Sequence, residues 1–330
     1  MGLPAGAFGT ASACAFMAFL QFEQLIDRDL IPLKDAEQLS NGHLDSTLVD
    51  WVPGMPTDMR LRDFMTFIRT TDPDDAVVAM FASYMEHLRT TSSAIVINTF
   101  DELEGEVLAA LSRSRVGVDV LPPDGGCLEW LQGKQPRSVL YVNFGSIIVL
   151  SREQLVELAW GLARSGHHLL WVIREGQAKG VDVAGGGDPI DMLPPEFAEE
   201  TKGRGYVTRW CPQEALLRHD AIGAFLTHCG WNSMLDSICN GIPMMCFPMF
   251  ADQPTNCRYA RTEWLIGVEV GNSIEREEVA RLVREVMEEE KGDEMRERAM
   301  EWKEKAAAAI APGGTSWVNL ERLVNDVFSP

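Results

Sequence analysis

The chain has 330 residues, of which 46% are hydrophobic, enough to bury the core of one large domain or of two ordinary ones. Its 29 basic and 49 acidic residues give a formal charge of −20, which disfavours nucleic acid and anionic membrane surfaces through long-range repulsion. The seven cysteines are odd in number and scattered without a CxxC pair, which argues against a disulfide framework or a zinc site and indicates a reducing, cytoplasmic compartment.

The N-terminal stretch carries no charged side chain from Gly2 to Leu20. It lacks the basic start and the cleavage pattern of a secretory signal, and Gly6 stands where myristoylation needs Ser or Thr. We expect no targeting role for it, and no other segment approaches a membrane span. Apolar residues on most sides of 7–28 predict a buried helix.

Residues 32–69 show no regular period, and Pro53-Gly54 and Pro56 interrupt regular structure. The large apolar side chains of this segment are Trp51, Met55, Met59, Phe64 and Phe67. Such side chains can line a pocket for a small apolar molecule, or they can pack against one another, and both interpretations stay open.

Helix and strand alternate in the next segment. We predict a helix over 74–90, a strand at 94–98 and a helix over 101–111, whose acidic first turn suits the helix dipole. A stretch that contains Pro and Gly follows and is interpreted as a linker. The predicted division is a first domain at 1–115, a linker at 116–126 and a second domain at 127–330.

The second domain continues the alternation. Short apolar runs predict strands at 138–144, 168–173, 205–208, 222–227 and 266–270. Ser151-Arg152-Glu153-Gln154 is a capping box that opens a helix to about residue 164. Further helices are predicted over 193–202, 253–264, 275–290, 292–311 and 316–328. This order is typical of an α/β fold with a parallel, doubly wound sheet.

Two turns of this domain are suited to an anion. After the strand at 138–144, Gly145-Ser146 can present backbone N–H groups to a phosphate. After the strand at 222–227, Gly230 allows close approach of a ligand, and Asn232 and Ser233 begin a helix whose open N–H groups and dipole also attract an anion.

The helix that begins at these residues has two different faces. Asn232, Ser233 and Asp236 lie three or four residues apart on one face, which we interpret as the chemical face. The spacing predicts that Leu235, Ile238 and Cys239 point towards the core.

Residues that flank this helix complete a candidate nucleotide-sugar site. Trp210 offers a flat ring for stacking on a base, and Gln213 offers an amide for a hydroxyl. The carboxylate of Asp236 can accept from both hydroxyls of a ribose, and Asp252-Gln253 can do the same for a sugar. His228 and Trp231 lie between the two groups. Taken singly, each of these residues is more often explained by a role in the core than by a role in binding.

Their order removes that ambiguity. The fragments WCPQEALL, THCGWNS and FADQPTN fall within the 44 positions from Trp210 to Gln253, and this stretch resembles the signature of the plant secondary-product UDP-glycosyltransferases. DWVPGM, RLRD, FIRTTDPDD and INTFDELE resemble the branch of that family with cyanohydrin and cytokinin glucosyltransferases. The resemblance implies a GT-B fold, two Rossmann-like domains with the donor held by the C-terminal one, and an N-terminal domain that is incomplete in this chain.

The resemblance also implies a role for each matching residue. Trp210 would stack on uracil, and Gln213 with Asp236 would hold the ribose. The diphosphate would be held by Ser146, His228, Asn232 and Ser233, and the sugar would be addressed by Trp231, Asp252 and Gln253. The sequence departs from the family pattern at Asp236, where Glu is usual, and at Met234, where Thr is usual.

A base that accepts the proton of the attacking hydroxyl is expected in such an enzyme. In the family this is a His near the N-terminus, oriented by an Asp. Met1-Gly2-Leu3-Pro4 aligns just beyond that Asp, so we expect neither residue in this chain and assign no catalytic residue.

The resemblance therefore predicts an inverting transferase that moves glucose from UDP-glucose to a hydroxyl of a small plant metabolite. It implies no cofactor and no metal, and we expect a cytoplasmic monomer. The alternative is a truncated, catalytically silent product that binds a UDP-sugar but lacks the base. A nicotinamide-dependent dehydrogenase is disfavoured, because no GxGxxG follows a strand at the start of either domain.

Overall fold

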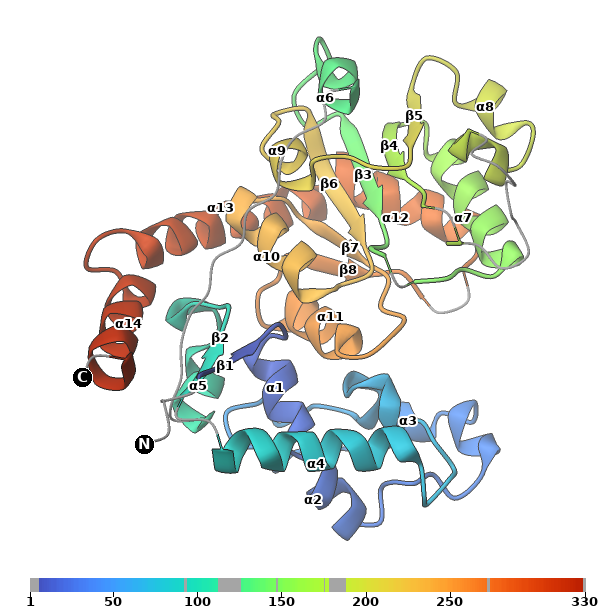
Figure 1. Cartoon of the computed structure of the whole chain (residues 1–330). Helices are drawn as coiled ribbons and strands as arrows, with labels where there is room; N and C mark the ends of the chain where they lie inside the picture. The colour runs from blue at the N-terminus through green and yellow to red at the C-terminus, as the bar shows by residue number, and fades with distance from the viewer. Residues whose placement is uncertain are drawn as a thin grey trace. The chain divides into compact units, whose positions relative to one another are not determined.

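The computed structural model describes residues 6–91, 94–111, 126–146, 148–174, 176–177, 188–271 and 274–328 (Figure 1). The chain forms two compact units. Unit 1 takes the chain up to Asp119 together with Met249–Arg258 and Glu304–Pro330, and unit 2 takes Val120–Pro248 and Tyr259–Lys303. These boundaries differ from the expected ones, because two segments of 127–330 join the N-terminal unit. The expected linker lies outside the described residues except for Gly126, and the functional division of the chain remains a prediction.

Unit 2 is built on a parallel sheet of six strands in the order β5-β4-β3-β6-β7-β8. The strands are β3 (Val139–Asn143), β4 (His168–Val172), β5 (Gly205–Thr208), β6 (Ile222–Thr227), β7 (Met244–Cys246) and β8 (Gly267–Glu269). The sequence predicted all of them but β7, whose three residues are too short for a recognisable period. The order reverses between β3 and β6, which confirms the doubly wound arrangement.

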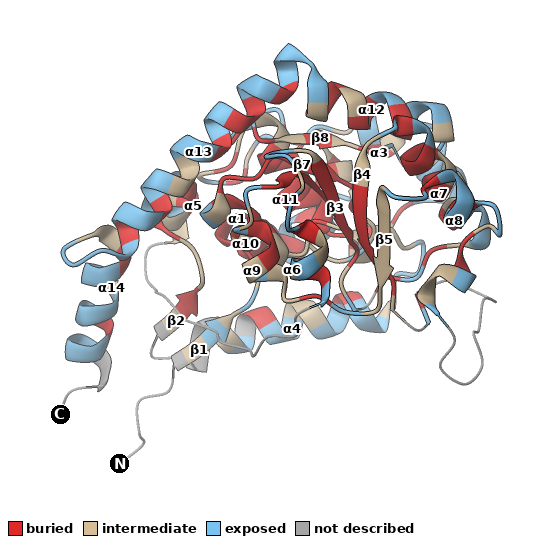
Figure 2. Cartoon of the chain, turned by 90° about the horizontal axis from the view of Figure 1, so that it is seen from above, coloured by how far each residue is buried: buried red, intermediate tan, exposed pale blue. Residues whose placement is uncertain are grey.

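The middle of this sheet is buried on both faces, as expected of parallel strands covered by helices. Every residue of β3 and β6 is buried, whereas β5 at the edge is only partly covered (Figure 2). The rings of Tyr141 and Phe225 on adjacent strands stack with centroids 4.6 Å apart. This rigid centre fixes the positions at which β3 and β6 end.

The helices of unit 2 precede, connect and follow these strands. They are α6 (Gly126–Leu131), α7 (Arg152–Ser165), α8 (Phe197–Glu200), α9 (Gln213–Leu217), α10 (Trp231–Asn240) and α12 (Arg276–Glu288). The capping box at the start of α7 is confirmed, because the Ser151 side chain accepts from the Gln154 backbone N–H and Gln154 bonds back. The helix predicted over 193–202 is shorter in the structure, where α8 begins only at Phe197. The predicted range includes Pro194 and Pro195, which lack the N–H needed inside a helix.

Two helices belong to both units. Helix α11 (Gln253–Thr262) begins in unit 1 and ends in unit 2. Helix α13 (Glu290–Ile310) begins in unit 2 and ends in unit 1. Both are continuous through the boundary. Among the residues that the structure describes, no helix is both long and apolar enough to cross a bilayer.

Unit 1 contains a parallel pair of strands and several helices. Its elements include β1 (Gly6–Gly9), α1 (Ala13–Phe19), α2 (Phe22–Asp27), α3 (His43–Ser46), α4 (Ala76–Thr91), β2 (Ala94–Ile97), α5 (Asp101–Leu111) and α14 (Thr315–Leu323). The single helix predicted over 7–28 is wrong, since β1 pairs with β2 and two short helices follow. Ser12 caps α1 by accepting from the Ala15 N–H, so the helix cannot start earlier.

The apolar side chains of 32–69 contribute to the core of unit 1. Met59 and Phe64 are fully buried, and the rings of Phe67 and Phe81 stack with centroids 4.6 Å apart. Phe19 stacks on the same Phe81 at 5.4 Å. Phe67 therefore packs against α4, and Met59 and Phe64 belong to the buried core.

Candidate functional site

The reversal of strand order places two chain turns beside each other at the carboxyl edge of the sheet. Asn143, the last residue of β3, is in register with Thr227, the last residue of β6. In open α/β sheets, ligands bind outside the carboxyl ends of the strands at such a switch point. The residues that follow these two ends, Gly145-Ser146 and His228, therefore lie where a ligand is expected.

The turn after β6 leads directly into α10. Cys229 takes a left-handed conformation with φ of 65°, and Gly230 is the N-cap with φ of −64° and makes no side-chain cap. Asn232 and Ser233 are in the first turn, as predicted. The N–H groups of this turn and the dipole of a ten-residue helix give a positive end suited to an anion.

Glycines on both turns make room for one imidazole. A Cβ at Gly145 would lie 2.7 Å from Cε1 of His228, and a Cβ at Gly230 would lie 3.0 Å from the same atom. Since Gly230 has an ordinary φ, its missing side chain serves the histidine rather than the backbone. The sequence predicted a glycine turn here for a different reason, namely close approach of a ligand.

His228 is neutral at ordinary pH. Burial lowers its pKa to about 4, while a hydrogen bond with the Asn143 backbone acts in the opposite direction. Its Nδ1 is buried and has no hydrogen-bond partner among the residues described. A buried nitrogen without a partner, beside a helix N-terminus, is suited to a polar group of a ligand.

Gln213 joins the ends of three elements. Its Nε2, at the start of α9, donates to Oδ2 of Asp236 at 2.8 Å and to Oγ of Ser233 at 3.2 Å. Its Oε1 accepts from Nδ2 of Asn143 at 3.1 Å and from the Tyr141 hydroxyl at 3.2 Å. The amide is therefore oriented by β3 and presents its donor side to α10.

Asp236 is partly buried on α10, and burial raises the pKa of its carboxyl group, while the bond from Gln213 acts against that rise. On the same helix face Ser233 is partly exposed and Asn232 is exposed. Ser233 and Asp236 share a face, because both accept from the Gln213 amide, and Asn232 precedes them in the first turn. The expectation for Cys239 is wrong, because its side chain is exposed while Leu235 and Ile238 are buried.

The tryptophans of the signature have different environments. Trp210 is 41% exposed, which leaves its ring accessible for stacking. Trp231 is only 3% exposed, and its ring lies 6.0 Å from that of Trp264. Ser146, after β3, is exposed.

Asp252 and Gln253 belong to unit 1. Gln253 is buried, and its Oε1 accepts from the N–H groups of Met249 and Phe250 at 2.9 and 2.8 Å. Asp252 accepts from Nδ2 of Asn256 at 2.9 Å, and burial raises its pKa. Both side chains thus fix the start of α11.

Two buried polar residues that the sequence did not identify accept hydrogen bonds from the start of α1, and one of them, Asn256, also donates to Asp252. Asn256 Oδ1 accepts from the Ser12 hydroxyl at 2.6 Å, so a bonded chain runs from α1 to Asp252. Glu104, at a kink in α5, is buried and accepts from the N–H groups of Ala13 and Cys14 at 3.0 and 2.8 Å. These contacts join residues about 90 or more positions apart, which no local pattern reveals.

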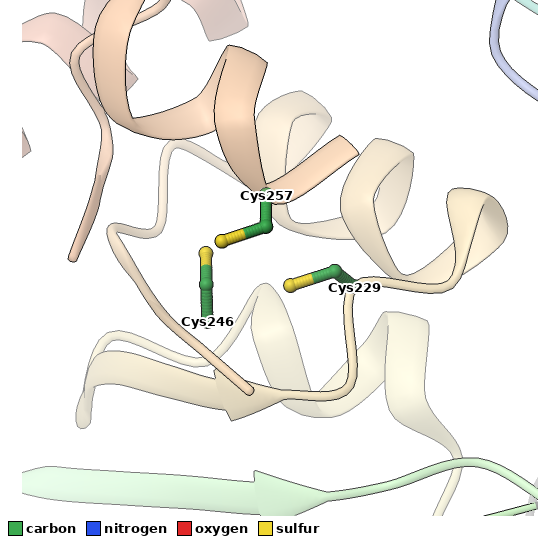
Figure 3. A group of neighbouring side chains, drawn as sticks. All are labelled: Cys229, Cys246 and Cys257. Atoms are coloured by element: carbon green, nitrogen blue, oxygen red, sulfur yellow. The ribbon is translucent and has the colours of Figure 1, made fainter. Parts of the chain in front are cut away.

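Three cysteines that are distant in sequence meet in space. The Sγ atoms of Cys229, Cys246 and Cys257 all lie within 4.8 Å of one another, and all three side chains are buried (Figure 3). The sequence gives no sign of this group, because its three cysteines are far apart in the chain and show no ligand spacing.

Comparison with known proteins identifies the family to which this chain is similar. The family model described as UDP-glucoronosyl and UDP-glucosyl transferase matches residues 121–302, more than half of the chain. A 7-deoxyloganetin glucosyltransferase of Gardenia jasminoides is 46% identical over all of this chain and 71% of its own length. An (R)-mandelonitrile beta-glucosyltransferase of Prunus dulcis is 44% identical over 99% of this chain and 71% of its own length.

Solved structures agree. UGT2 of Phytolacca americana, complexed with UDP-2fluoro-glucose and pterostilbene, superposes with a TM-score of 0.82 at 28% identity, over 98% of this chain and 70% of that one. A UDP-glucose: anthocyanidin 3-O-glucosyltransferase in complex with UDP gives a TM-score of 0.83 at 26% identity, over 99% of this chain and 71% of that one. The fold class is therefore GT-B, as the resemblance implied, and the chain belongs to the plant UDP-glycosyltransferase family.

Proposed function

We propose that this glycosyltransferase moves glucose from UDP-glucose to a hydroxyl of a small plant metabolite. The names of the Gardenia and Prunus relatives, both glucosyltransferases, support glucose as the sugar. The Phytolacca structure, which holds UDP-2fluoro-glucose and a small molecule, supports the pairing of substrates.

The observation that carries the proposal is the preset pair of Gln213 and Asp236. A ribose presents two hydroxyls as donors, and an ionised carboxylate accepts from both. Because Gln213 already donates to Oδ2 of Asp236, that carboxylate is held in one orientation before the nucleotide arrives. In this proposal the exposed ring of Trp210 stacks on uracil.

The diphosphate is proposed to bind at the turns after β3 and β6. Asn232, Ser233 and Ser146 supply polar groups there, and the first turn of α10 supplies backbone N–H groups. An anion beside His228 favours its protonated form, so bound diphosphate would raise the pKa of this imidazole from about 4. Hydrogen bonds and the helix dipole then stabilise the departing UDP.

The sugar roles of Trp231, Asp252 and Gln253 remain predictions from the resemblance. Trp231 is proposed to act through its backbone N–H at the start of α10, because its side chain is buried. In the family, the residue at the position of Gln253 is associated with glucose more than with galactose.

The chemical step is proposed to be a single displacement with inversion. The acceptor oxygen attacks the anomeric carbon, the bond to the diphosphate oxygen breaks, and the proton of the acceptor passes to a base. We assign no residue of this chain as that base.

Two measurements on the same preparation test the proposal. Calorimetric titration with UDP should give one site per chain, and incubation with radiolabelled UDP-glucose and phenolic or cyanohydrin acceptors should label the acceptor. Proton NMR of the product should show the β-anomer, as inversion of the α-linked donor requires. Binding of UDP without transfer to any acceptor would instead favour the silent UDP-sugar binder, and absence of both would contradict the proposal.

A further inference from the structure

Arg174 lies at the carboxyl edge of the sheet of unit 2. Asn143 and Val172, the last residues of β3 and β4, are paired in register, so these neighbouring strands end at the same level. Gly145 follows the end of β3 by two residues, and Arg174 follows the end of β4 by two. Arg174 is therefore next to the turn at which the diphosphate is proposed to bind.

The buried side chain of Gln177 joins these two strand ends. Its Oε1 accepts from the backbone N–H of Arg174 at 3.1 Å, and its Nε2 donates to the carbonyl of Gly145 at 3.3 Å. Its own backbone N–H donates to the Arg174 carbonyl at 3.2 Å, and its carbonyl accepts from the Leu150 N–H at 2.8 Å. One amide thus holds the backbone of Arg174 against the turn after β3.

The positive charge of Arg174 acts on two side chains of the site. Burial lowers the pKa of His228, and the charge of Arg174 acts in the same direction. Burial raises the pKa of the Tyr141 hydroxyl, and the same charge acts against that rise. His228 follows β6 and Tyr141 belongs to β3, so the guanidinium lies close to the two turns that flank the switch point.

The guanidinium of Arg174 has a donor to spare. Its Nε is buried and makes no hydrogen bond within the part of the chain that the structure describes. Buried N–H groups are normally paired, so this donor is suited to a partner that arrives with a ligand. The residue as a whole is partly exposed, and rotation of its long side chain can turn the guanidinium towards an anion.

Charge complementarity favours such a partner. The residues proposed to hold the diphosphate supply no positive charge, since Ser146, Asn232 and Ser233 are uncharged and burial keeps His228 neutral at ordinary pH. The chain itself has a formal charge of −20, which repels an anion at long range. A guanidinium at the site offsets this repulsion, and its planar fork matches two phosphate oxygens.

We propose that Arg174 is a binding residue for the diphosphate of the nucleotide, to which its guanidinium donates hydrogen bonds. This inference rests on the proposed function, because it requires a diphosphate beside the turn after β3. Negative charge grows on the diphosphate as UDP departs, so the same guanidinium also favours the departure.

Titrations of UDP by calorimetry and of uridine by NMR test the inference. Arg174→Gln, which removes the charge and keeps a polar side chain, should bind UDP about tenfold more weakly and uridine as the wild type does. Added salt should weaken UDP binding more in the wild type than in this variant. Arg298→Gln removes an exposed charge from α13 within the same unit and is the matched control, with unchanged affinity for UDP.

The outcomes separate this inference from the proposed function. Absence of UDP binding by the wild type would contradict both. If the wild type binds UDP, equal affinity of Arg174→Gln and Arg298→Gln would overturn the role of Arg174 alone. An equal loss for UDP and uridine would also overturn it, because that result indicates a structural role.

A second variant keeps the test decisive if Arg174→Gln does not fold, which circular dichroism reveals. Arg174→Lys keeps the charge but lacks the planar fork. Weaker binding of UDP with unchanged binding of uridine supports the inference. Unchanged affinity for both ligands, or an equal loss for both, contradicts it.

Discussion

The side-chain amide of Gln213, at the start of α9, donates a hydrogen bond of 2.8 Å to the carboxylate of Asp236 on α10. The other end of the same amide is held by Tyr141 and Asn143 of β3. Strand, short helix and long helix are thus joined through one side chain at the switch point of the sheet. The orientation of Asp236 depends on that junction.

Replacing Gln213 by leucine should weaken UDP binding by about tenfold, because the carboxylate loses the donor that orients it. In the wild type, the hydrogen bond from Gln213 partly offsets the rise that burial causes in the pKa of Asp236. Without that bond, the pKa of Asp236 should rise further. Calorimetry with UDP gives the affinity, and Gln135→Leu, the same change at an exposed position, is the control. Equal affinity of Gln213→Leu and the control would contradict this role.

Replacing Gly230 by alanine should displace His228 without straining the backbone, because the φ of this residue is ordinary. The added methyl group meets the imidazole, so we expect destabilisation of about 1–3 kcal/mol, typical of overpacking, and weaker UDP binding. Gly271→Ala is the matched control, since nothing lies within 4 Å of a Cβ there. Urea unfolding of both variants checks the difference. The prediction fails if the two variants are equally stable.

The depressed pKa of His228 should make the stability of the chain fall with acidity. Its folded pKa is about 4, whereas an unfolded histidine titrates near ~6.5, so the unfolded state binds the proton first as pH falls. The contribution of neutral His228 to the free energy of unfolding is therefore fully present above the pKa of the unfolded state. By linkage, about 2 kcal/mol of it should be lost between pH 7 and pH 5.

Urea unfolding of the wild type and of His228→Asn at these two pH values isolates that contribution. The variant removes the histidine and leaves the other titrating groups, including Asp236 and Asp252, in both proteins. Between pH 7 and pH 5, His228→Asn should lose about 2 kcal/mol less stability than the wild type. An identical loss in both proteins would show that His228 does not titrate in this way.

Replacing Glu104 by glutamine should destabilise the fold of unit 1. Both carboxylate oxygens accept from donors, namely the N–H groups of Ala13 and Cys14 and the Thr99 hydroxyl at 2.6 Å, and an amide would turn one of these positions into a donor. A loss of about 1–3 kcal/mol is expected from unfolding measurements. Glu106→Gln, on an exposed position of the same helix, should change stability by less than about 0.5 kcal/mol. Similar values for the two variants would rule out the bonding role of Glu104.

Local patterns predicted much of the fold. The buried strands β3 and β6 and the capping box of α7 are written in contiguous residues, so periodicity and cap chemistry identify them. The segment 7–28 misled the prediction because its apolar residues suit either a strand or a helix, and pairing with β2 decides between them. Pairing with a strand almost 90 residues away is not visible locally.

The candidate site divides in the same way. Residues of the signature were predicted from their order, and the structure places Gln213, Ser233 and Asp236 in contact. The partners that orient them, Asn143 and Tyr141, come from a strand some 70 residues earlier. The neutral state of His228 depends on burial, which only the folded chain reveals.

The central claim is that Asp236 of unit 2 holds the ribose of UDP, and a double comparison tests it most directly. UDP and 2′-deoxy-UDP are titrated calorimetrically into the wild type and into Asp236→Ala. The wild type should bind UDP at one site and lose about tenfold in affinity when the hydroxyl is removed, whereas the variant should bind both nucleotides equally and weakly. If the wild type does not bind UDP, or if Asp236→Ala still distinguishes the two nucleotides as the wild type does, the assignment of this site is contradicted.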